Sequence, residues 1–208
     1  METVLIFVGG DSPSSPLAEE LPTADLVVAA DSGYDLAVAE GFPVDVLIGD
    51  MDSIIADHIP AHVIVERHPS DKDATDLELA LSRVVVERPD RVVVVGGAGG
   101  RFDHELAVAG LISAETWADV DEIDWVTDRG WSYVVRGRRI LHGDVGATIS
   151  LIPMGGPALG VTTRGLRWNL REATLAHGTT HGISNVFTGP VADITVRMGC
   201  VLVVVPAG

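Results

Sequence analysis

Two aspartates, Asp50 and Asp52, stand two positions apart directly after an apolar run, with Gly49 before them. In extended chain, residues at i and i+2 point to the same side, so both carboxylates can meet one hard cation such as Mg²⁺. The preceding glycine lets the backbone approach a ligand closely. Loop aspartates also cap helices, so the pair alone is weak evidence for a metal site.

Carboxylates recur in the same kind of position along the first part of the chain. Several short apolar runs lead into an aspartate, and these aspartates are Asp11, Asp31, Asp50, Asp76 and Asp103. In an open parallel sheet, the carboxyl ends of the strands meet at one edge, where ligands bind. Crowded carboxylates repel one another unless a cation neutralises them. The pattern therefore predicts Mg²⁺ with a bound polyphosphate at this edge.

The segment from Ser70 to Asp76 carries both signs of charge. Lys72, the only lysine of the chain, lies between Asp71 and Asp73. It is placed to act as a point charge for a phosphate, and the alternative is charge balance with its neighbours. Asp73 is explained equally well as the N-cap of a helix that begins at Ala74. Capping explains Asp76 less well and Lys72 not at all.

A glycine-rich segment, residues 96–100, follows a valine run and leads into Arg101 and a predicted helix. Exposed backbone N–H groups, a helix N-terminus and an arginine together favour phosphate binding. The segment is not a P-loop, because no Gly-Lys-Ser/Thr ends it. It is not the dinucleotide fingerprint either, since Phe102 occupies the place of the third glycine. A tight turn without a ligand is the alternative.

The elements that must position these residues change in type near residue 130. Before it, apolar runs typical of buried parallel strands alternate with helical patterns. The predicted strands are 3–8, 25–30, 44–48, 62–65 and 91–95, and the predicted helices are 35–40, 74–87 and 103–117. This alternation predicts an α/β domain with a mainly parallel sheet over residues 1–130, which would hold the predicted site for Mg²⁺ and a polyphosphate.

After residue 130, short strands separated by glycine and proline replace the helical patterns. These predicted strands are 131–135, 147–152, 160–163, 183–187, 191–197 and 200–205. Such spacing is typical of an antiparallel β-sandwich or a barrel-like module. We therefore expect a second domain over residues 131–208.

The composition limits the partners and the compartment. The formal charge is −16, and residues 1–110 hold 21 acidic and 6 basic side chains, a net −15. General binding to nucleic acid or to an anionic membrane is therefore not expected. Cys200 is the only cysteine, which excludes an intrachain disulfide. The first residues lack a basic segment, and no run of 18 apolar residues occurs, so we expect a cytoplasmic protein.

Taken together, the motifs resemble the thiamine pyrophosphokinase family over nearly the whole chain. The resemblance rests on their order and spacing, and they are Ala30-Asp-Ser-Gly33, Ile48-Gly-Asp-Met-Asp-Ser-Ile54, Pro69-Ser-Asp-Lys-Asp-Ala-Thr-Asp76, Gly99-Gly-Arg-Phe-Asp103, Thr162-Thr-Arg-Gly-Leu-Arg-Trp-Asn-Leu170 and Gly182-Ile-Ser-Asn185. The last two matter most, because the catalytic half also looks like that of related pyrophosphokinases.

The resemblance implies an α/β catalytic domain, a C-terminal β-sandwich and a homodimer with thiamine near the subunit interface. It implies Mg²⁺-dependent transfer of the pyrophosphoryl group of ATP to the hydroxyl of thiamine, with release of AMP. By motif, Asp50, Asp52 and Asp76 would hold Mg²⁺ and would form the catalytic set with Asp103. The residues toward ATP and its phosphates would be Asp31, Ser70, Lys72, Asp73, Thr75, Gly99, Gly100 and Arg101.

By the same resemblance, the residues on the thiamine side would be Thr162, Trp168, Ser184 and Asn185. Trp168 offers a ring face to the cationic thiazolium, and a core aromatic of the β domain is the alternative. Either Asp103 or Asp76 would accept the proton of the attacking hydroxyl.

Three other functions remain open at this stage. Asp50-Met-Asp52-Ser53 mimics the nucleophile motif of haloacid-dehalogenase-like phosphatases, although it follows the third predicted strand rather than the first. A pyrophosphokinase for a pterin alcohol would share the catalytic half. A non-enzymatic module would bind magnesium-nucleotide or thiamine without releasing AMP.

Overall fold

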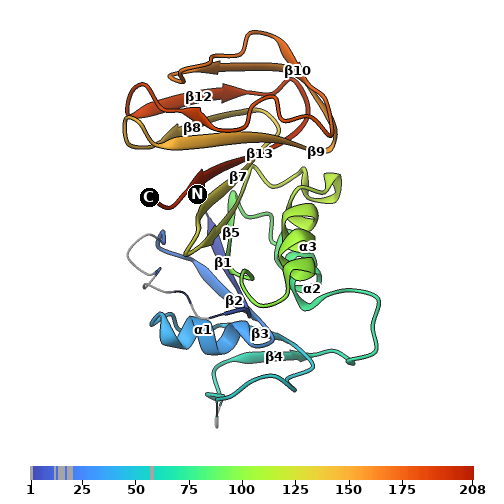
Figure 1. The fold of residues 1–208 in the computed structure, drawn as a ribbon. Helices are drawn as coiled ribbons and strands as arrows, with labels where there is room; N and C mark the ends of the chain where they lie inside the picture. Colours follow the sequence, from blue (N-terminus) through green and yellow to red (C-terminus); the bar gives the residue numbers. More distant parts are fainter. Residues whose placement is uncertain (1, 12, 14–16, 18–20, 57–58) are drawn as a thin grey trace. The chain divides into compact units, whose positions relative to one another are not determined.

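The computed structural model describes residues 2–11, 13, 17, 21–56 and 59–208 (Figure 1). The chain divides into two compact units. The first contains residues 1–111 and 119–128, and the second contains residues 112–118 and 129–208.

A parallel sheet forms the centre of the first unit. Its strands are β1 (Thr3–Val8), β2 (Leu26–Ala30), β3 (Val46–Gly49), β4 (Ile64–Arg67), β5 (Arg91–Gly96) and β6 (Glu122–Thr127), in the order β4-β3-β2-β1-β5-β6. Val92 to Val95 of β5 are fully buried, as a strand covered on both faces requires. The predicted mainly parallel sheet is confirmed, although β6 was not predicted.

Among the described residues of the first unit, three helices cover this sheet. They are α1 (Gly33–Ala39), α2 (Asp76–Val85) and α3 (Phe102–Ile112), with α1 on one side and α2 and α3 on the other (Figure 1). Right-handed crossovers produce this division. The crossover through α1 runs toward the β4 edge of the sheet, whereas those through α2 and α3 run toward the β6 edge, so the helices lie on opposite faces. The predicted helix over 103–117 is wrong at its end, since a separate 3₁₀ turn, η1 (Glu115–Trp117), follows α3.

The start of α2 differs from the prediction. Thr75 is the N-cap, and its side-chain oxygen accepts a hydrogen bond from the Glu78 N–H at 3.2 Å. The alternative that Asp73 caps a helix beginning at Ala74 is therefore wrong. The threonine hydroxyl accepts an N–H of the first helical turn that has no partner within the helix. The helix therefore begins after Thr75, and the exposed Asp73 lies outside it.

The prediction for β4 is also wrong in detail. We expected a covered strand over 62–65, whereas β4 lies two residues further on at the edge of the sheet, with Ile64 57% exposed. An apolar run alone does not distinguish an edge strand from a central one.

The chain topology brings separate loops together at the carboxyl edge. From β1 the chain runs outward through β2, β3 and β4, and it then returns to β5 and β6 on the other side of β1. Val8 lies opposite Ala30 on one side and Gly96 on the other. The residues that follow β1, β2 and β5 therefore meet at a topological switch point, where α/β proteins bind ligands.

Aspartates also stabilise the opposite, amino edge of the same sheet. Each accepts a backbone N–H at or directly before the start of a neighbouring strand: Asp90 from Glu2 at 2.7 Å, Asp25 from Thr3 at 2.8 Å and Asp45 from Val27 at 2.8 Å. Part of the negative charge of the first unit thus has a structural role away from the predicted ligand edge.

The second unit is antiparallel in every strand pair that the structure describes. Its strands are β7 (Gly130–Val135), β8 (Arg138–His142), β9 (Thr148–Arg164), β10 (Ala173–Leu175), β11 (Asn185–Val186), β12 (Val191–Thr195) and β13 (Met198–Pro206). β9 is central, with β13 and β7 on one side and β12 and β8 on the other. The predicted antiparallel character is confirmed.

Two predicted strands, 147–152 and 160–163, are one long strand, β9. Gly155 lies within it at φ +69°, so the glycines and Pro157 mark an irregularity inside a strand rather than a turn between strands. The predicted strand over 183–187 is reduced to the two residues of β11, and β8 and β10 were not predicted. Side chains from both sides of β9, including Leu141, Ile194 and Val203, form one core.

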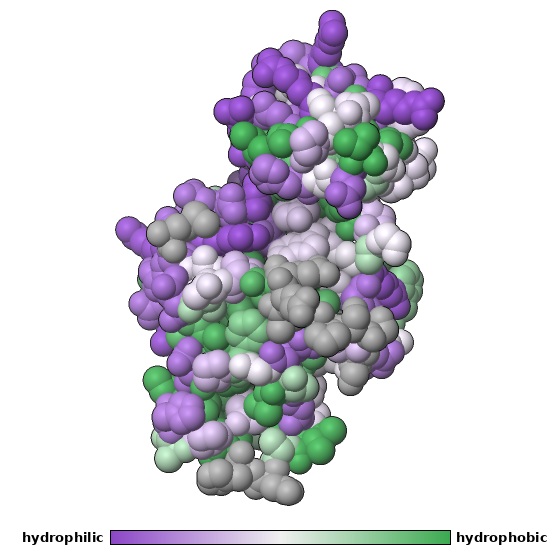
Figure 2. Space-filling view, turned by 90° about the vertical axis from the view of Figure 1, so that its left-hand side faces the viewer, coloured by the Kyte–Doolittle hydropathy of each residue, from purple (hydrophilic) through white to green (hydrophobic). Residues whose placement is uncertain are grey.

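In the described part of the chain, no helix is long and apolar enough to span a membrane. On the face shown in Figure 2, hydrophilic residues are interspersed with smaller hydrophobic groups.

Candidate functional site

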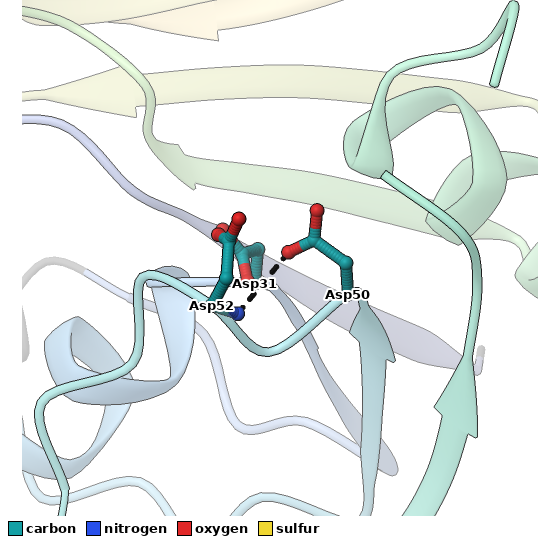
Figure 3. A group of neighbouring side chains, drawn as sticks. All are labelled: Asp31, Asp50 and Asp52. Atoms are coloured by element: carbon teal, nitrogen blue, oxygen red, sulfur yellow. Dashed lines mark hydrogen bonds between the residues drawn. The ribbon is translucent and has the colours of Figure 1, made fainter. Parts of the chain in front are cut away.

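Three aspartates from two strand ends come together at the carboxyl edge of the first unit (Figure 3). Asp31 follows β2, and Asp50 and Asp52 follow β3. One carboxylate oxygen of each lies within 4.8 Å of those of the other two. The pairing of Ala30 with Ile48 aligns the two strands so that these side chains meet. Three convergent carboxylates are the hard oxygen donors that Mg²⁺ or Ca²⁺ prefers.

Gly49 allows this close approach. A Cβ atom at this position would lie 3.1 Å from the Asp31 Cβ and 3.2 Å from Asp76 Oδ1, and the backbone φ is +149°. Any larger residue would therefore push against two of the predicted site residues. Asp76, from the first turn of α2, is thus brought next to Asp31, although it lies 45 positions further along the chain.

The electrostatics of the cluster separate Asp50 from Asp52. The Asp52 N–H donates a hydrogen bond to Asp50 Oδ1 at 3.2 Å, and this bond is the main cause that lowers the pKa of Asp50. The pKa of Asp52 is raised, first by its side-chain hydrogen bond with Asp50 and then by the negative charge of Asp50. The pair therefore favours retaining a proton on Asp52 when no cation is near.

Two buried carboxylate oxygens at the site lack a hydrogen-bond donor. Within the described residues, Asp31 Oδ1 and Asp76 Oδ1 are buried and accept no hydrogen bond. Lys72 Nζ lies 3.2 Å from Asp76 Oδ1 as an ion pair but donates its hydrogen bond to the Pro69 carbonyl at 3.0 Å. Buried acceptors without a donor are what a cation would satisfy, so the donor set fits Mg²⁺.

Side chains that were not predicted hold the aspartate loop. The Ser53 hydroxyl donates to Asp31 Oδ2. Asp35, in the first turn of α1, accepts the N–H groups of Ile55 at 2.9 Å and Ala56 at 3.1 Å. The loop that carries Asp50 and Asp52 is therefore tied to the start of α1. The available signal was Asp35 four residues after Asp31 on a predicted helix.

A cavity of about 700 Å³ opens beside the cluster. This volume is in the range of small-molecule sites. Of the predicted residues, its wall contains Asp31, Thr75, Asp76, Gly99, Gly100 and Arg101. Residues that were not predicted also line it, and they include Gly9, Gly10, Ser32, Glu78 and His104 together with the apolar Ala107, Val108 and Leu111 of α3.

The other predicted residues of the first unit lie outside the described wall of this cavity: Asp50, Asp52, Ser70, Lys72, Asp73 and Asp103. Ser70 and Asp73 are exposed, whereas Lys72 is partly buried against Asp76. Lys72 thus pairs with Asp76, four residues away, whereas the alternative interpretation named its neighbours Asp71 and Asp73.

Arg101 and Asp103 bind each other at the beginning of α3. Arg101 Nε donates to Asp103 Oδ1 at 3.2 Å, and Nη2 donates to Oδ2 at 2.5 Å. These hydrogen bonds lower the pKa of Asp103. A carboxylate with a lowered pKa is a weak proton acceptor, so this pairing disfavours Asp103 as the general base unless Arg101 moves to a ligand.

In the second unit, Trp168 is 56% exposed, so its alternative interpretation as a core aromatic is wrong. The Arg167 guanidinium carbon lies 4.9 Å from the centre of the Trp168 ring. Asn185, by contrast, is buried, and its side chain bonds the backbone of Trp168. Asn185 thus holds the backbone of Trp168, while the indole ring remains exposed to solvent.

Thr162 and Ser184 are held by local hydrogen bonds. The Thr162 hydroxyl accepts the Glu172 N–H at 3.1 Å and lies 3.3 Å from Glu172 Oε1. Ser184 is exposed, has a φ of +57°, and donates its N–H to the Ser150 hydroxyl at 3.0 Å. Thr162 also lines a second cavity, of about 340 Å³, with Arg164 and Arg171.

The first unit belongs to the class of parallel α/β proteins with a carboxylate-bordered ligand cavity at the switch point. Comparison with known families gives a more specific result. Residues 17–119 match the family described as thiamin pyrophosphokinase, catalytic domain, and residues 138–201 match thiamin pyrophosphokinase, vitamin B1 binding domain. The chain belongs to the thiamin pyrophosphokinase family.

Individual relatives agree with this assignment. The chain is 30% identical over 171 residues to thiamine pyrophosphokinase 1 of Oryza sativa subsp. japonica, an alignment that covers 74% of this chain and 61% of the relative. Over 116 residues it is 34% identical to thiamine pyrophosphokinase of Bacillus subtilis, covering 51% of this chain and 52% of the relative. The chain thus spans about three fifths of the length of the rice protein.

Solved structures show the same fold. The crystal structure of thiamine pyrophosphokinase from Bacillus subtilis aligns with a TM-score of 0.86 at 23% identity and covers all of both chains. Thiamin pyrophosphokinase from Candida albicans aligns with a TM-score of 0.78 at 14% identity, over all of this chain and 89% of the other. The predicted fold class is therefore confirmed.

Proposed function

We propose that this chain is a thiamine pyrophosphokinase, which transfers the pyrophosphoryl group of ATP to the hydroxyl of thiamine and releases AMP. One observation carries the proposal: the oxygens of Asp31, Asp50 and Asp52 converge beside a cavity that Asp31 and Asp76 also line. Family membership supports the choice of thiamine as the acceptor.

Asp50, Asp52 and Asp76, with Asp31 beside them, would hold Mg²⁺. When bound there, the ion would neutralise the phosphate oxygens of ATP and the charge of the leaving AMP. The fit rests on the buried Oδ1 atoms of Asp31 and Asp76, which accept no hydrogen bond within the described residues.

The residues of the chain would supply the remaining interactions. The cavity would take the nucleotide, with Thr75, Gly99, Gly100 and Arg101 near its phosphates. Ser70, Lys72 and Asp73 would close on them from the segment before α2. Such contacts position the reacting groups and stabilise charge, which is most of the catalysis in phosphoryl transfer.

In the reaction, the hydroxyl oxygen of thiamine would bond to the β-phosphorus of ATP. The bond from that phosphorus to the oxygen bridging to the α-phosphate would break, and AMP would leave with the bridging oxygen. The hydroxyl proton needs an acceptor, which would be Asp103 or Asp76. Each could act as a base only after its cationic partner, Arg101 or Lys72, has turned to the phosphates.

The exposed ring of Trp168 would stack on the thiazolium cation. Ser184 and Thr162 would lie near the same ligand, and Asn185 would act through Trp168. We also propose a homodimer and a cytoplasmic location, both as expected from the family resemblance and the composition. Size-exclusion chromatography with light scattering tests the first, and cell fractionation tests the second.

The central experiment incubates the protein with ATP, Mg²⁺ and thiamine and measures thiamine diphosphate and AMP. Equal amounts of both products are expected, and neither should form without thiamine. Formation of AMP only with a hydroxymethyl pterin would favour the pterin enzyme. Trapping of phosphate on Asp50 would favour the phosphatase, and tight binding of ATP without AMP release would favour a binding module.

A further inference from the structure

Two glycine-containing loops hold each other at the switch point of the first unit. One comprises residues 9–11 after β1, and the other comprises residues 97–100 after β5. The Asp11 N–H donates to the Ala98 carbonyl at 3.1 Å, and the Gly100 N–H donates to Asp11 Oδ2 at 2.9 Å. One aspartate therefore bonds the second loop through both its backbone and its carboxylate.

The contact between these loops leaves no room for larger residues. A Cβ atom on Gly99 would lie 2.6 Å from the Asp11 Cβ, and one on Gly10 would lie 2.6 Å from the Ala98 carbonyl oxygen. Gly99 and Gly100 also have φ values of +81° and +61°, a region that favours glycine. The second loop is thus held in a conformation that the Asp11 hydrogen bond stabilises.

Both loops form part of the cavity wall, whereas the described wall does not include Asp11. The carboxylate therefore supports the loop from outside the cavity. The partner of this carboxylate is the N–H of Gly100, the residue directly before Arg101. The hydrogen bond therefore fixes the backbone position at which the Arg101 side chain begins. The same bond occupies the Gly100 N–H, so that group is not available to a phosphate in this conformation.

We propose that Asp11 is a positioning residue for nucleotide binding, which holds the Gly99–Gly100 turn and thereby places Arg101 at the phosphates. This inference rests on the proposed function in one respect, that the cavity takes ATP. Asp11 acts through its hydrogen bond and not through its charge, so an uncharged acceptor of the same shape can replace it.

The test compares Asp11→Ala with Asp11→Asn. Asparagine retains a side-chain oxygen that can accept the Gly100 N–H, whereas alanine does not. Binding of a non-hydrolysable ATP analogue with Mg²⁺ is measured by calorimetry, and KM values are measured for ATP and thiamine. For Asp11→Ala we expect at least about a tenfold weaker affinity for the analogue and a similar rise in the ATP KM. The thiamine KM should stay within about twofold, and Asp11→Asn should behave like the unchanged protein.

Asp45→Ala is the matched control, because Asp45 also accepts one backbone N–H, that of Val27, at the opposite edge of the sheet. Thermal unfolding of this variant and of Asp11→Ala measures the general effect of losing such a bond. The control should bind the analogue normally once it is folded at the assay temperature. A parallel loss of affinity in both variants would show a merely structural role and would overturn the proposal.

Two other results would also overturn it. One is an unchanged affinity of Asp11→Ala for the analogue. The other is an equal loss of affinity in Asp11→Asn and Asp11→Ala, which would assign the effect to charge. Failure of the proposed function has a different signature. In that case the unchanged protein would bind the analogue, Asp11→Ala would weaken binding, and no thiamine diphosphate would form.

Discussion

Asn185 and Trp168 are joined by two hydrogen bonds between one side chain and one backbone. Asn185 Nδ2 donates to the Trp168 carbonyl at 2.8 Å, and the Trp168 N–H donates to Asn185 Oδ1 at 3.0 Å. Asn185 is 4% exposed, and Trp168 is 56% exposed. The buried amide thus holds the backbone of a residue whose ring is more than half exposed and has Arg167 against it, so the two residues should affect function in different ways.

Trp168→Ala should raise the thiamine KM and leave the ATP KM and the unfolding temperature nearly unchanged. A cation–π contact of about 0.5–2 kcal/mol corresponds to a rise of about 2- to 30-fold. Steady-state kinetics with each substrate varied measures the effect. Ile140→Ala, which truncates another half-exposed apolar side chain of this unit, is the control. An unchanged thiamine KM in Trp168→Ala would remove the ring from the thiamine site.

Asn185→Ala should lower stability as well as raise the thiamine KM. The substitution leaves two backbone groups of Trp168 without their partner, a loss of about 1–3 kcal/mol for each buried group that water does not reach. Denaturant unfolding and the thiamine KM are measured on the same preparations. A stability loss without any change in KM would separate Asn185 from the positioning of the tryptophan.

Asp50→Asn and Asp52→Asn should each reduce kcat by at least about a hundredfold while the fold is retained, since each removes one charged donor from the cluster. Binding of Mn²⁺, followed by electron paramagnetic resonance, should weaken in both variants without any need for turnover. Activity within a few-fold of the unchanged protein would exclude these residues from metal binding.

The raised pKa of Asp52 has a consequence for stability in the absence of metal. A carboxyl group whose pKa is higher in the folded than in the unfolded chain stabilises the fold below the unfolded pKa, and this contribution is lost as pH rises through the folded pKa. Asp52→Asn cannot ionise and keeps an amide near Asp50. Its unfolding temperature should therefore exceed that of the metal-free protein at neutral pH.

This difference should shrink as the pH is lowered toward and below 3.8, the ordinary pKa of an aspartate. Calorimetric scans over a pH series in a chelating buffer provide the measurement. A lower unfolding temperature for Asp52→Asn at neutral pH would contradict the predicted repulsion.

Asp124→Ala should destabilise the first unit strongly. Asp124 is fully buried in β6, and its Oδ2 accepts hydrogen bonds from Arg91 at 2.6 Å and 2.9 Å. Breaking a fully buried ion pair costs about 3–5 kcal/mol, and this is the upper limit here, because the Arg91 side chain is 20% exposed and also lies 3.6 Å from Glu122. Differential scanning calorimetry measures the change. Arg138→Ala, which breaks the exposed pair with Asp193 in the second unit, should change stability little and is the control.

Local patterns were sufficient to predict the core of the fold. The valine run of β5 predicts a buried parallel strand, and Leu77, Leu81 and Val84 of α2 are buried as their helical spacing requires. Asp50 and Asp52 also meet, but not through the extended chain that was predicted, because Met51 between them has a φ of +70° and the segment forms a loop. Motif order along the chain identified the family, because it depends on sequence alone.

Contacts between distant segments were not available from these patterns. The approach of Asp76 to Asp31 depends on the packing of α2 against Gly49, and the bond from Asp11 to Gly100 joins residues 89 positions apart. Nor does spacing reveal that Asp25, Asp45 and Asp90 serve the amino edge of the sheet while Asp31 and Asp50 serve the carboxyl edge. The sequence by its own chemistry determines which strands and motifs are present, whereas the strand order decides which of their side chains meet, because that order is set by packing over the whole sheet.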